Sequence, residues 1–281
     1  MIKMICDSTA YLPKPLIKKH GIEIIPLSVI LGEEVLVETN ITNRAFFKKL
    51  NSSHHHPTSS QPSVDSFYSV FEKHISNGDS IIFTCISSKM SGTYANAVSV
   101  KNMLKEKYPD AEIEIIDSES NCMQLGYAVL TGARMIAKDK SFEETASAVK
   151  QCIYKTRMLF IPESLKFLHK SGRLSAAQAL MASILKIVPI LTVENGSASV
   201  FSKIRTRAKA KNTMLSELYN DIKSGSVADI SVIHIDSENE ASKMIEAVKK
   251  MINIDINLTS IGPVIGAHVG PGTIGLVWKN K

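Results

Sequence analysis

The sequence predicts an α/β protein made of two α/β units, and three observations support this prediction. In the first half, short apolar β-rich runs alternate with helical patterns, as in the βαβ units of a parallel sheet. In the second half, Asn195-Gly196 stands between two extended runs, which is typical of a hairpin. The composition, with 44% apolar and 21% charged residues in a chain of 281, is that of a globular protein and excludes disordered and fibrous classes.

The first half contains runs typical of buried strands, each followed by helical patterns. The strands are expected at residues 1–6, 80–86 and 112–117. The helices are expected at residues 13–20, 43–50, 64–75, 93–107, 123–138 and 142–154. Residues 22–38 form a further pair of extended runs around a turn at Gly32. Strands that alternate with helices of this length predict a parallel sheet covered on both faces.

The second half predicts a mixed sheet. Its expected elements are a hairpin of 188–193 and 198–204, a helix at 208–222, a strand at 230–236, a helix at 240–251, and two apolar strands at 262–267 and 273–278 around a glycine-rich loop. We place the boundary near residue 160, within a few residues, between an N-terminal domain, 1–160, and a C-terminal domain, 161–281. Because no low-complexity linker separates them, we expect the domains to pack closely and to leave a ligand cleft between them.

Charge and motifs exclude several classes of function. Thirty-three Lys and Arg against 27 Asp and Glu give a net charge of +6, which suits an anionic partner. No basic patch interleaved with aromatic residues is present, so we expect no nucleic-acid binding. The chain has neither a GxxxxGK[ST] loop nor a GxGxxG turn after its first strand, and we expect no cofactor. The adjacent histidines 54–56 lack a spaced acidic or Cys partner, so they indicate a solvated loop rather than a metal site.

Several features favour a cytoplasmic location. The four cysteines form no CxxC pair, as is usual in a reducing compartment, and they stand at Cys6, Cys85, Cys122 and Cys152. The first strand begins at once and leaves no room for a signal peptide. The longest apolar stretch, 179–193, is interrupted by Lys186 and Pro189 and is too short to span a bilayer, so we expect at most peripheral membrane contact.

Two segments rich in hydroxyl side chains precede expected helices. The first, Pro57-Thr58-Ser59-Ser60-Gln61-Pro62-Ser63, leads to the helix at 64–75, and the second, Ser87-Ser88-Lys89-Met90-Ser91-Gly92-Thr93-Tyr94, joins the strand at 80–86 to the helix at 93–107. Free backbone N–H groups at helix starts favour an anion. The alternative is a polar loop with a Ser cap, with Ser91 as the cap of the second helix.

Two further segments place cationic and glycine residues in turns. In Leu168-His169-Lys170-Ser171-Gly172-Arg173-Leu174-Ser175, Gly172 resembles a helix C-cap and Ser175 the next N-cap. Arg173 is either a solvated charge or, if it faces the cleft, a partner for a carboxylate or phosphate. In the glycine-rich segment 261–275, His268 is either structural or a ligand for a head group.

Taken together, these segments resemble the DegV family. The resemblance rests on Asp7-Ser8-Thr9, Thr58-Ser59-Ser60-Gln61-Pro62-Ser63, the segment 87–94, Asp117-Ser118, Gly172-Arg173, Lys203-Ile204-Arg205 and His268-Val269-Gly270-Pro271-Gly272. They occur in family order from residue 2 to residue 278, and it is the ordered set rather than any single motif that is specific.

The resemblance implies two α/β domains that hold a long-chain fatty acid, such as palmitate, with its carboxylate between them. It implies a non-catalytic subunit that presents the acid to a separate ATP-dependent fatty-acid kinase, which makes an acyl phosphate for phospholipid synthesis. By position, the carboxylate hydroxyls fall on Ser59 and Ser91, with Thr58 able to share the role because the family has Thr where this chain has Ser59. Arg173 and His268 match polar residues near the head group, and Arg205 matches a position facing the kinase.

Two questions stay open at the level of sequence. The residues Met90, Met123, Leu165 and Ile184 are candidates for an acyl tunnel, although apolar residues in such patterns also form ordinary core. The alternative function is a Ser-dependent acyl hydrolase or transferase in which Ser91 is the nucleophile, His268 the base and Asp7 or Asp117 the third member. Against it, the segment around Ser91 lacks the GxSxG elbow that exposes an esterase serine.

Overall fold

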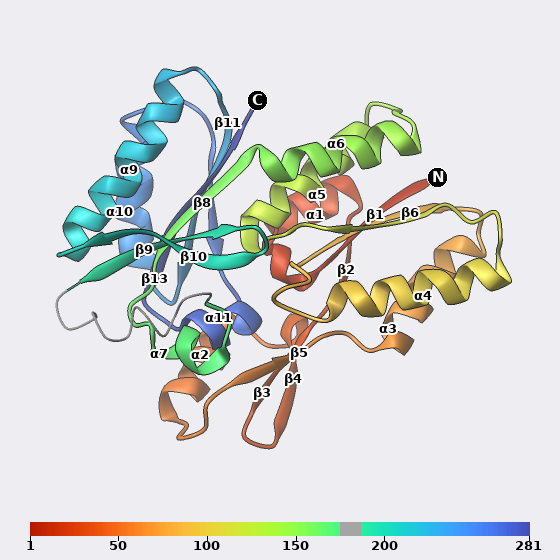
Figure 1. Ribbon diagram of the computed structural model, residues 1–281, viewed down its shortest axis with the longest axis horizontal. Coiled ribbons are helices and arrows are strands. Elements are labelled where there is room, and N and C mark those ends of the chain that lie inside the picture. The colour runs from red at the N-terminus through yellow and green to blue at the C-terminus, as the bar shows by residue number, and fades with distance from the viewer. Residues whose placement is uncertain (175–186) are drawn as a thin grey trace.

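Three sheets organise the computed structural model, which describes residues 1–174 and 187–281. A parallel sheet of order β2-β1-β6-β7 and a larger sheet of order β10-β9-β8-β13-β11-β12 lie side by side, and a small sheet of order β4-β3-β5 projects below them (Figure 1). The strands are β1 Ile2–Asp7, β2 Glu23–Ile25, β3 Ser28–Leu31, β4 Glu34–Val37, β5 Thr58–Ser60, β6 Ser80–Cys85, β7 Ile113–Asp117, β8 Thr156–Ile161, β9 Val188–Glu194, β10 Ser197–Ile204, β11 Val227–Ile235, β12 Ile256–Ser260 and β13 Thr273–Asn280.

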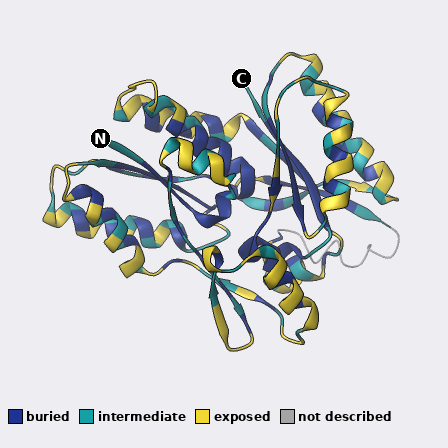
Figure 2. Ribbon diagram, turned by 180° about the vertical axis from the view of Figure 1, so that it is seen from behind, coloured by how far each residue is buried: buried dark blue, intermediate teal, exposed yellow. Residues whose placement is uncertain are grey.

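Helices cover both main sheets. They are α1 Lys14–His20, α2 Asn43–Ser52, α3 Val64–Ile75, α4 Thr93–Lys107, α5 Cys122–Ile136, α6 Phe142–Tyr154, α7 Lys166–Ser171, α9 Arg207–Lys223, α10 Glu238–Lys249 and α11 Pro263–Val269. In α3, α4, α6, α9 and α10, one face of the helix is buried and the opposite face is exposed (Figure 2). This is the amphipathic arrangement that the helical patterns of the sequence predict.

The parallel sheet has the predicted βαβ construction. The strand β1 pairs in parallel with β2 and β6, and β6 pairs in parallel with β7. One face is covered by α3 and α4, where Phe67, Phe71 and Phe83 pack edge to face. The other face is covered by α5 and α6. A sheet buried on both faces explains why its strands read as continuous apolar runs.

The larger sheet is mixed, as predicted. Among its described strands, β11 and β12 pair in parallel and the other neighbours pair antiparallel. The hairpin of β9 and β10 turns at Asn195-Gly196, and both residues have positive φ, as a primed turn requires. The outer face is covered by α9 and α10. Its inner face is turned toward α5 and α11, where the candidate site lies.

Helix α5 joins the two main sheets. It contacts β1 and β6 of the parallel sheet and β8 and β13 of the mixed sheet, and most of its residues are buried. The hydroxyls of Tyr127 in α5 and Ser231 in β11 hydrogen-bond at 2.7 Å across this interface. A helix that is apolar around most of its circumference is expected to be buried on several sides.

The main departure from the predicted elements lies in the glycine-rich segment. Residues 262–267 were expected as a strand, whereas Pro263–Val269 form the helix α11. All seven residues of this helix are buried, so the run shows no periodicity, and a short apolar run without periodicity fits a strand and a buried helix equally. Pro263 at the first helical position is the signal that favours a helix.

Three strands lie where none was expected. They are β5, which is short and polar, β8, which follows α6 directly, and β12, which has five residues of which two are apolar. The boundary predicted near residue 160 falls within β8, all of which belongs to the mixed sheet. The chain passes from one main sheet to the other at the end of α6. Within the described residues, no helix is both long and apolar enough to cross a membrane.

Candidate functional site

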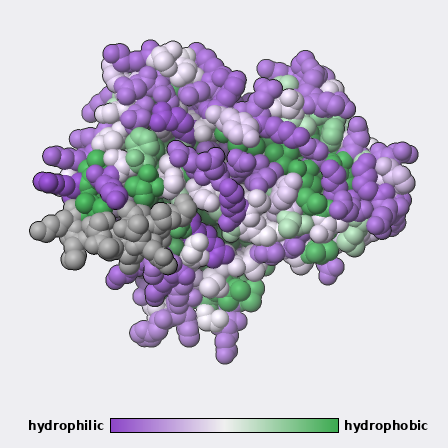
Figure 3. All heavy atoms as spheres, in the orientation of Figure 1, coloured by the Kyte–Doolittle hydropathy of each residue, from purple (hydrophilic) through white to green (hydrophobic). Residues whose placement is uncertain are grey.

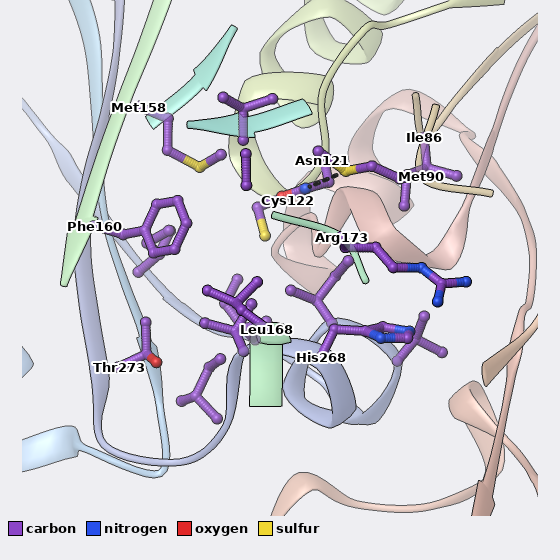
Figure 4. A pocket seen from close by; sticks show the side chains of 18 of the residues that line it. Ile86, Met90, Asn121, Cys122, Met158, Phe160, Leu168, Arg173, His268 and Thr273 are labelled. Carbon is purple, nitrogen blue, oxygen red and sulfur yellow. Dashed lines mark hydrogen bonds between the residues drawn. The ribbon is translucent and has the colours of Figure 1, made fainter. Parts of the chain in front are cut away.

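An apolar cavity lies between α5, the inner face of the mixed sheet and α11. It holds about 740 Å³ not filled by protein atoms, including the part that opens to solvent. Its walls include Met158 and Phe160 of β8, Leu168 of α7 and Cys122 of α5, and Figure 4 shows these side chains turned toward one space. A mostly apolar lining with a few polar groups is typical of a site for a small organic ligand. On the face of the molecule seen in Figure 3 most of the surface is hydrophilic, and apolar residues gather in smaller patches.

Polar side chains gather at one part of the cavity wall. Ser59, Ser91, Arg173 and His268 all line it. Arg173 and His268 lie on the same side in Figure 4, opposite Met158 and Phe160. Ser59, Ser91 and Arg173 also line an adjoining polar hollow, together with Gln61 and Lys89. The cavity is therefore amphipathic, with a polar end that adjoins a more polar opening and a body that is mostly apolar but also includes Asn121, His234 and Thr273.

Ser59 and His268 meet although 209 positions separate them in the sequence. Ser59 Oγ lies 2.6 Å from His268 Nε2. Strand β5 positions the serine by pairing with β3, where Ser59 stands opposite Val29. Helix α11 positions the histidine in its last turn. The sequence identified both residues but not their pairing.

The imidazole of His268 is uncharged near neutral pH. Its pKa is lowered to about 4, mainly by burial and in addition by the positive charge of Arg173 and by the neighbouring His56. The Nδ1 atom is buried and has no hydrogen-bond partner among the described residues. With Nε2 on Ser59, the ring can either accept the serine proton or donate to the serine oxygen, depending on its tautomer.

Ser91 lies at the start of α4 without capping it. The N-cap is Gly92, which makes no side-chain cap, so the expectation of a cap at Ser91 is off by one residue. Ser91 Oγ instead lies 2.8 Å from Thr93 Oγ1 and accepts a hydrogen bond from Thr93 N at 3.3 Å. A Cβ atom at Gly92 would lie 2.5 Å from Gln61 Nε2. The glycine therefore allows the segments 57–63 and 87–94 to touch.

The first hydroxyl segment serves two purposes. Ser63 caps α3 by accepting a hydrogen bond from Ser66 N at 3.1 Å, as the capping interpretation predicts. Thr58, Ser59 and Ser60 form β5 instead of approaching the helix. Because successive side chains in a strand point to opposite faces, Ser59 faces the cavity, whereas Thr58 is exposed and does not line it. The expectation that Thr58 shares the role of Ser59 is not supported by this placement.

Arg173 stands in a turn, as predicted. Gly172 has positive φ and caps α7 at its C-terminus, so this part of the interpretation is right. Arg173 Nη1 donates to the carbonyl of Ser171, and the residue is exposed, so one edge of the guanidinium is accessible at the polar hollow. Ser175, expected as the next N-cap, lies outside the described residues.

The remaining candidates are placed as follows. Arg205 is exposed after β10 and forms no ion pair with a described residue. Met90 lines the cavity and accepts a hydrogen bond from Asn121 Nδ2 on its sulfur (Figure 4). Met123 and Leu165 belong to the packed core and do not line the cavity. Ile184 lies outside the described residues.

Among the residues that the structure describes, no Ser-His-Asp arrangement forms around Ser91. His268 Nε2 is paired with Ser59, and Ser91 Oγ is paired with Thr93. Asp7 accepts from Thr9 and from Ile86 N, and Asp117 accepts from the backbone of residues 88 and 119. Because neither carboxylate orients the imidazole, the alternative of a hydrolase based on Ser91 is not supported by this geometry.

Sequence reasoning missed Glu38 and Tyr11. Glu38 Oε1 accepts from Val264 N at 2.8 Å and from Tyr11 Oη at 2.7 Å, and Ile265 N donates to Tyr11 Oη at 3.1 Å. These contacts cap the N-terminus of α11, the helix that carries His268. No pattern around Glu38 marks it as buried, although only 6% of its surface is exposed.

Among the described residues, no group of three or more His, Cys, Asp or Glu side chains is arranged to hold a metal ion. The polar end of the cavity offers hydroxyl, imidazole and guanidinium groups instead. Such groups suit a small anion, and a carboxylate joined to an apolar chain would match both parts of the cavity.

Comparisons with known proteins agree over the whole chain. The family profile described as "Uncharacterised protein, DegV family" matches residues 1–281. A DegV domain-containing protein of Clostridium acetobutylicum is 44% identical over 280 residues, which are 100% of this chain and 98% of that protein. The crystal structure of DegV from Bacillus subtilis, described as a fatty acid binding protein, has a TM-score of 0.90 at 33% identity and covers 100% of this chain and 99% of that one.

A second solved structure is similar. It is described as a fat acid (stearic acid)-binding protein from Eubacterium ventriosum, with a TM-score of 0.90, 27% identity and coverage of 99% of this chain and 98% of that one. Both descriptions name a fatty acid as the ligand of those proteins.

Proposed function

This chain belongs to the DegV family, and from that premise we propose that it binds one long-chain fatty acid, such as palmitate. The carboxylate lies at the polar end, near Ser59, Ser91, Arg173 and His268, and the acyl chain fills the apolar body of the cavity. The observation that carries this proposal is the cavity itself, whose single apolar space ends at hydroxyl, imidazole and guanidinium groups.

The neutral imidazole supports an anionic ligand through Ser59. In the tautomer with a proton on Nε2, His268 donates to Ser59 Oγ. The serine proton is then free to donate to a carboxylate, and the bond from the imidazole strengthens that donation. Ser91 and Arg173 supply further donors at the same end of the cavity. A carboxylate removed from water needs several such donors.

The acyl chain supplies most of the binding energy in this proposal. Burial of about fourteen methylene groups contributes up to about 11 kcal/mol at ~0.8 kcal/mol each, before the costs of ordering and association are subtracted. The head-group contacts therefore fix the direction of the ligand, while the apolar wall holds it.

We propose further that the protein is not an enzyme by itself but presents its bound acid to a separate ATP-dependent fatty-acid kinase, which makes an acyl phosphate for phospholipid synthesis. The adjoining hollow supports this role because it would leave the carboxylate end approachable from outside. Arg205 is exposed and unpaired among the described residues, as a docking residue for an acidic surface must be, and the net charge of +6 favours the same kind of partner.

Native mass spectrometry of the purified protein tests the binding proposal. We expect one adduct with the mass of a long-chain fatty acid, which organic extraction releases. Ser59→Ala is expected to reduce this adduct, as is Ser91→Ala. The matched control is Thr58→Ala, which removes a hydroxyl from the opposite face of the same strand and is expected to leave the adduct unchanged. A protein that is free of ligand and takes up no added palmitate would overturn the proposal.

The kinase role has a separate test. A bacterial fatty-acid kinase, ATP and the palmitate-loaded protein are expected to give acyl phosphate, whereas the protein with ATP alone gives none. Arg205→Ala is expected to slow acyl-phosphate formation while the bound palmitate stays unchanged. Equal rates for Arg205→Ala and the unmodified protein would remove Arg205 from the kinase interface. Acyl-ester turnover by this protein alone would contradict its non-catalytic role.

A further inference from the structure

Three side chains from the N-terminal part of the chain form a buried cluster at the start of α11. Ser8 Oγ donates to Glu38 Oε2 at 2.5 Å, and Tyr11 Oη donates to Glu38 Oε1 at 2.7 Å. The backbone N–H groups of Val264 and Ile265 complete the cluster by donating to Glu38 and to the Tyr11 oxygen. Every one of these contacts, within the described part of the chain, ends on an acceptor oxygen of Glu38 or Tyr11.

Glu38 is an unusual carboxylate because it is buried without a cation. It is 6% exposed, and within residues 1–174 and 187–281 its hydrogen-bond donors are Ser8, Tyr11 and Val264, none of them a cation. A carboxylate in this position is costly unless several donors satisfy it. The donors that satisfy it here come from two separate parts of the fold. Ser8 and Tyr11 follow β1 of the parallel sheet, and Val264 belongs to α11.

The cluster is fitted closely to the helix. A Cβ atom at Gly262, the N-cap of α11, would lie 2.7 Å from Tyr11 Cε1 and 2.8 Å from Glu38 Oε1. There is consequently no room for any other residue at this position without movement of the cluster. Gly262, the first glycine of the segment 261–275, thus allows Glu38 and Tyr11 to approach the helix and does not contact a ligand site.

Movement at this end of α11 reaches the site directly. The helix has seven residues, and Val264, which Glu38 holds, is four positions before His268. Residues four apart lie on the same face of a helix, one turn from each other. A shift of Val264 therefore moves the imidazole relative to Ser59, which is fixed separately in β5.

We propose that Glu38 is a positioning residue for the polar end of the cavity. It holds α11 at the height and rotation that bring His268 Nε2 to Ser59 Oγ, and Ser8 and Tyr11 hold Glu38 in turn. This assignment gives the Asp7-Ser8-Thr9 motif a structural role, because Ser8 holds Glu38 although the motif does not line the cavity. It rests on the proposed function only for its effect on fatty-acid affinity.

A double-mutant cycle on palmitate affinity tests the proposal. Glu38→Ala is expected to weaken binding about tenfold in the unmodified protein and less than about twofold in a His268→Ala background, because a positioning residue acts through the group it positions. Glu38→Gln keeps an acceptor for Val264 and Tyr11 and is expected to restore affinity to within about twofold. The same loss in both backgrounds, or no rescue by Gln, would overturn the proposal.

A control variant separates positioning from general destabilisation. Tyr127→Phe removes the buried hydrogen bond to Ser231, which also joins the two sides of the molecule but does not touch α11. It is expected to lower stability and leave palmitate affinity unchanged. If Glu38→Ala does not fold, Tyr11→Phe removes the hydroxyl that contacts Glu38 and Ile265, and the cycle is run with that variant. An affinity loss for Tyr127→Phe equal to that for Glu38→Ala would contradict the proposal.

The ligand-free protein provides a test that does not depend on fatty-acid binding. NMR of labelled histidine reports the hydrogen bond between His268 and Ser59 through the Nε2 shift. We expect Glu38→Ala, but not Tyr127→Phe, to move this shift toward that of a solvated imidazole. An unchanged shift refutes positioning by Glu38. A protein that shows the expected shift yet binds no palmitate would refute the proposed function and leave the positioning role intact.

Discussion

Replacement of Glu38 by Gln is expected to make the protein more stable near neutral pH and to flatten the dependence of its stability on pH. Burial raises the pKa of Glu38 from 4.5 to about 7, against the opposing effect of hydrogen bonds from Ser8, Val264 and Tyr11. The raised pKa means that the folded protein holds this proton more tightly than the unfolded chain does. Stability from Glu38 is therefore complete below pH 4.5 and is lost as the pH rises through 7.

The magnitude follows from the two pKa values. With 4.5 in the unfolded chain and about 7 in the folded protein, linkage gives a loss of about 2.5 kcal/mol between about pH 5 and about pH 8. Glu38→Gln does not titrate, so the difference in unfolding free energy between this variant and the unmodified protein should change by that amount over the same interval. In thermal unfolding this corresponds to about 5 °C.

Urea unfolding of Glu38→Gln and of the unmodified protein, each at about pH 5 and at about pH 8, measures this difference in unfolding free energy directly. The control is Glu246→Gln, which changes an exposed carboxyl of α10 that forms no hydrogen bond with a described residue, and we expect the stability of this variant to depend on pH as that of the unmodified protein does. Asp7 titrates in both proteins and cancels in the comparison, provided that its pKa is unchanged. If Glu38→Gln is less stable than the unmodified protein by the same amount at both pH values, the reasoning about a buried, raised pKa is refuted.

Three further predictions concern the site. His268 is expected to titrate with a pKa of about 4 in NMR of the ligand-free protein, and a bound fatty-acid carboxylate should raise that pKa; a midpoint near 6.5 without ligand would contradict its burial. Gly275→Ala should destabilise the protein by about 1–3 kcal/mol in urea unfolding, because a Cβ would lie 2.9 Å from the Leu159 carbonyl oxygen, and an unchanged midpoint would contradict this packing. Arg173→Ala should weaken palmitate binding severalfold at low salt and less at high salt, since the guanidinium is exposed; a loss independent of salt would argue against a charge contact.

Local signals allowed much of the fold to be predicted. The helices at 64–75 and 142–154 match their predicted limits, and each begins after a serine whose side chain caps it, Ser63 and Ser141. Short elements without periodicity were missed because their structure comes from partners distant in sequence. Strand β5 exists through pairing with β3, and α11 is a helix although its apolar run fits a strand as well.

The site was predictable as a set of residues but not as an arrangement. Hydroxyl and glycine content identified the segments containing Ser59 and His268, yet nothing local shows that these two side chains pair. Thr58 points away from the cavity because successive side chains of β5 alternate, and that strand was not expected from the sequence. Glu38 gave no signal at all, because a glutamate after an alternating strand is most often exposed and its burial results from the docking of α11.

Asp7, the last residue of β1, and Ser8, the next residue, support both sides of the polar end. Asp7 Oδ2 accepts from Ile86 N at 2.6 Å, directly before the segment that carries Ser91, and Ser8 supports Glu38 and, through it, α11. Burial raises the pKa of Asp7 to about 6, as it raises that of Glu38, so two buried carboxylates without cations reduce stability near neutral pH.

Apolar residues in these two places would avoid that cost, but they would leave the N–H groups of Ile86 and Val264 without acceptors. Those N–H groups belong to the loop and the helix that set the height of Ser91 and His268. Rigid support of this kind outside the cavity is what a precise head-group site requires. The two carboxylates are therefore best understood as stability exchanged for the geometry of the site. For Glu38, loss of the acceptor in Glu38→Ala should weaken ligand binding, whereas loss of the charge alone in Glu38→Gln should raise stability near neutral pH.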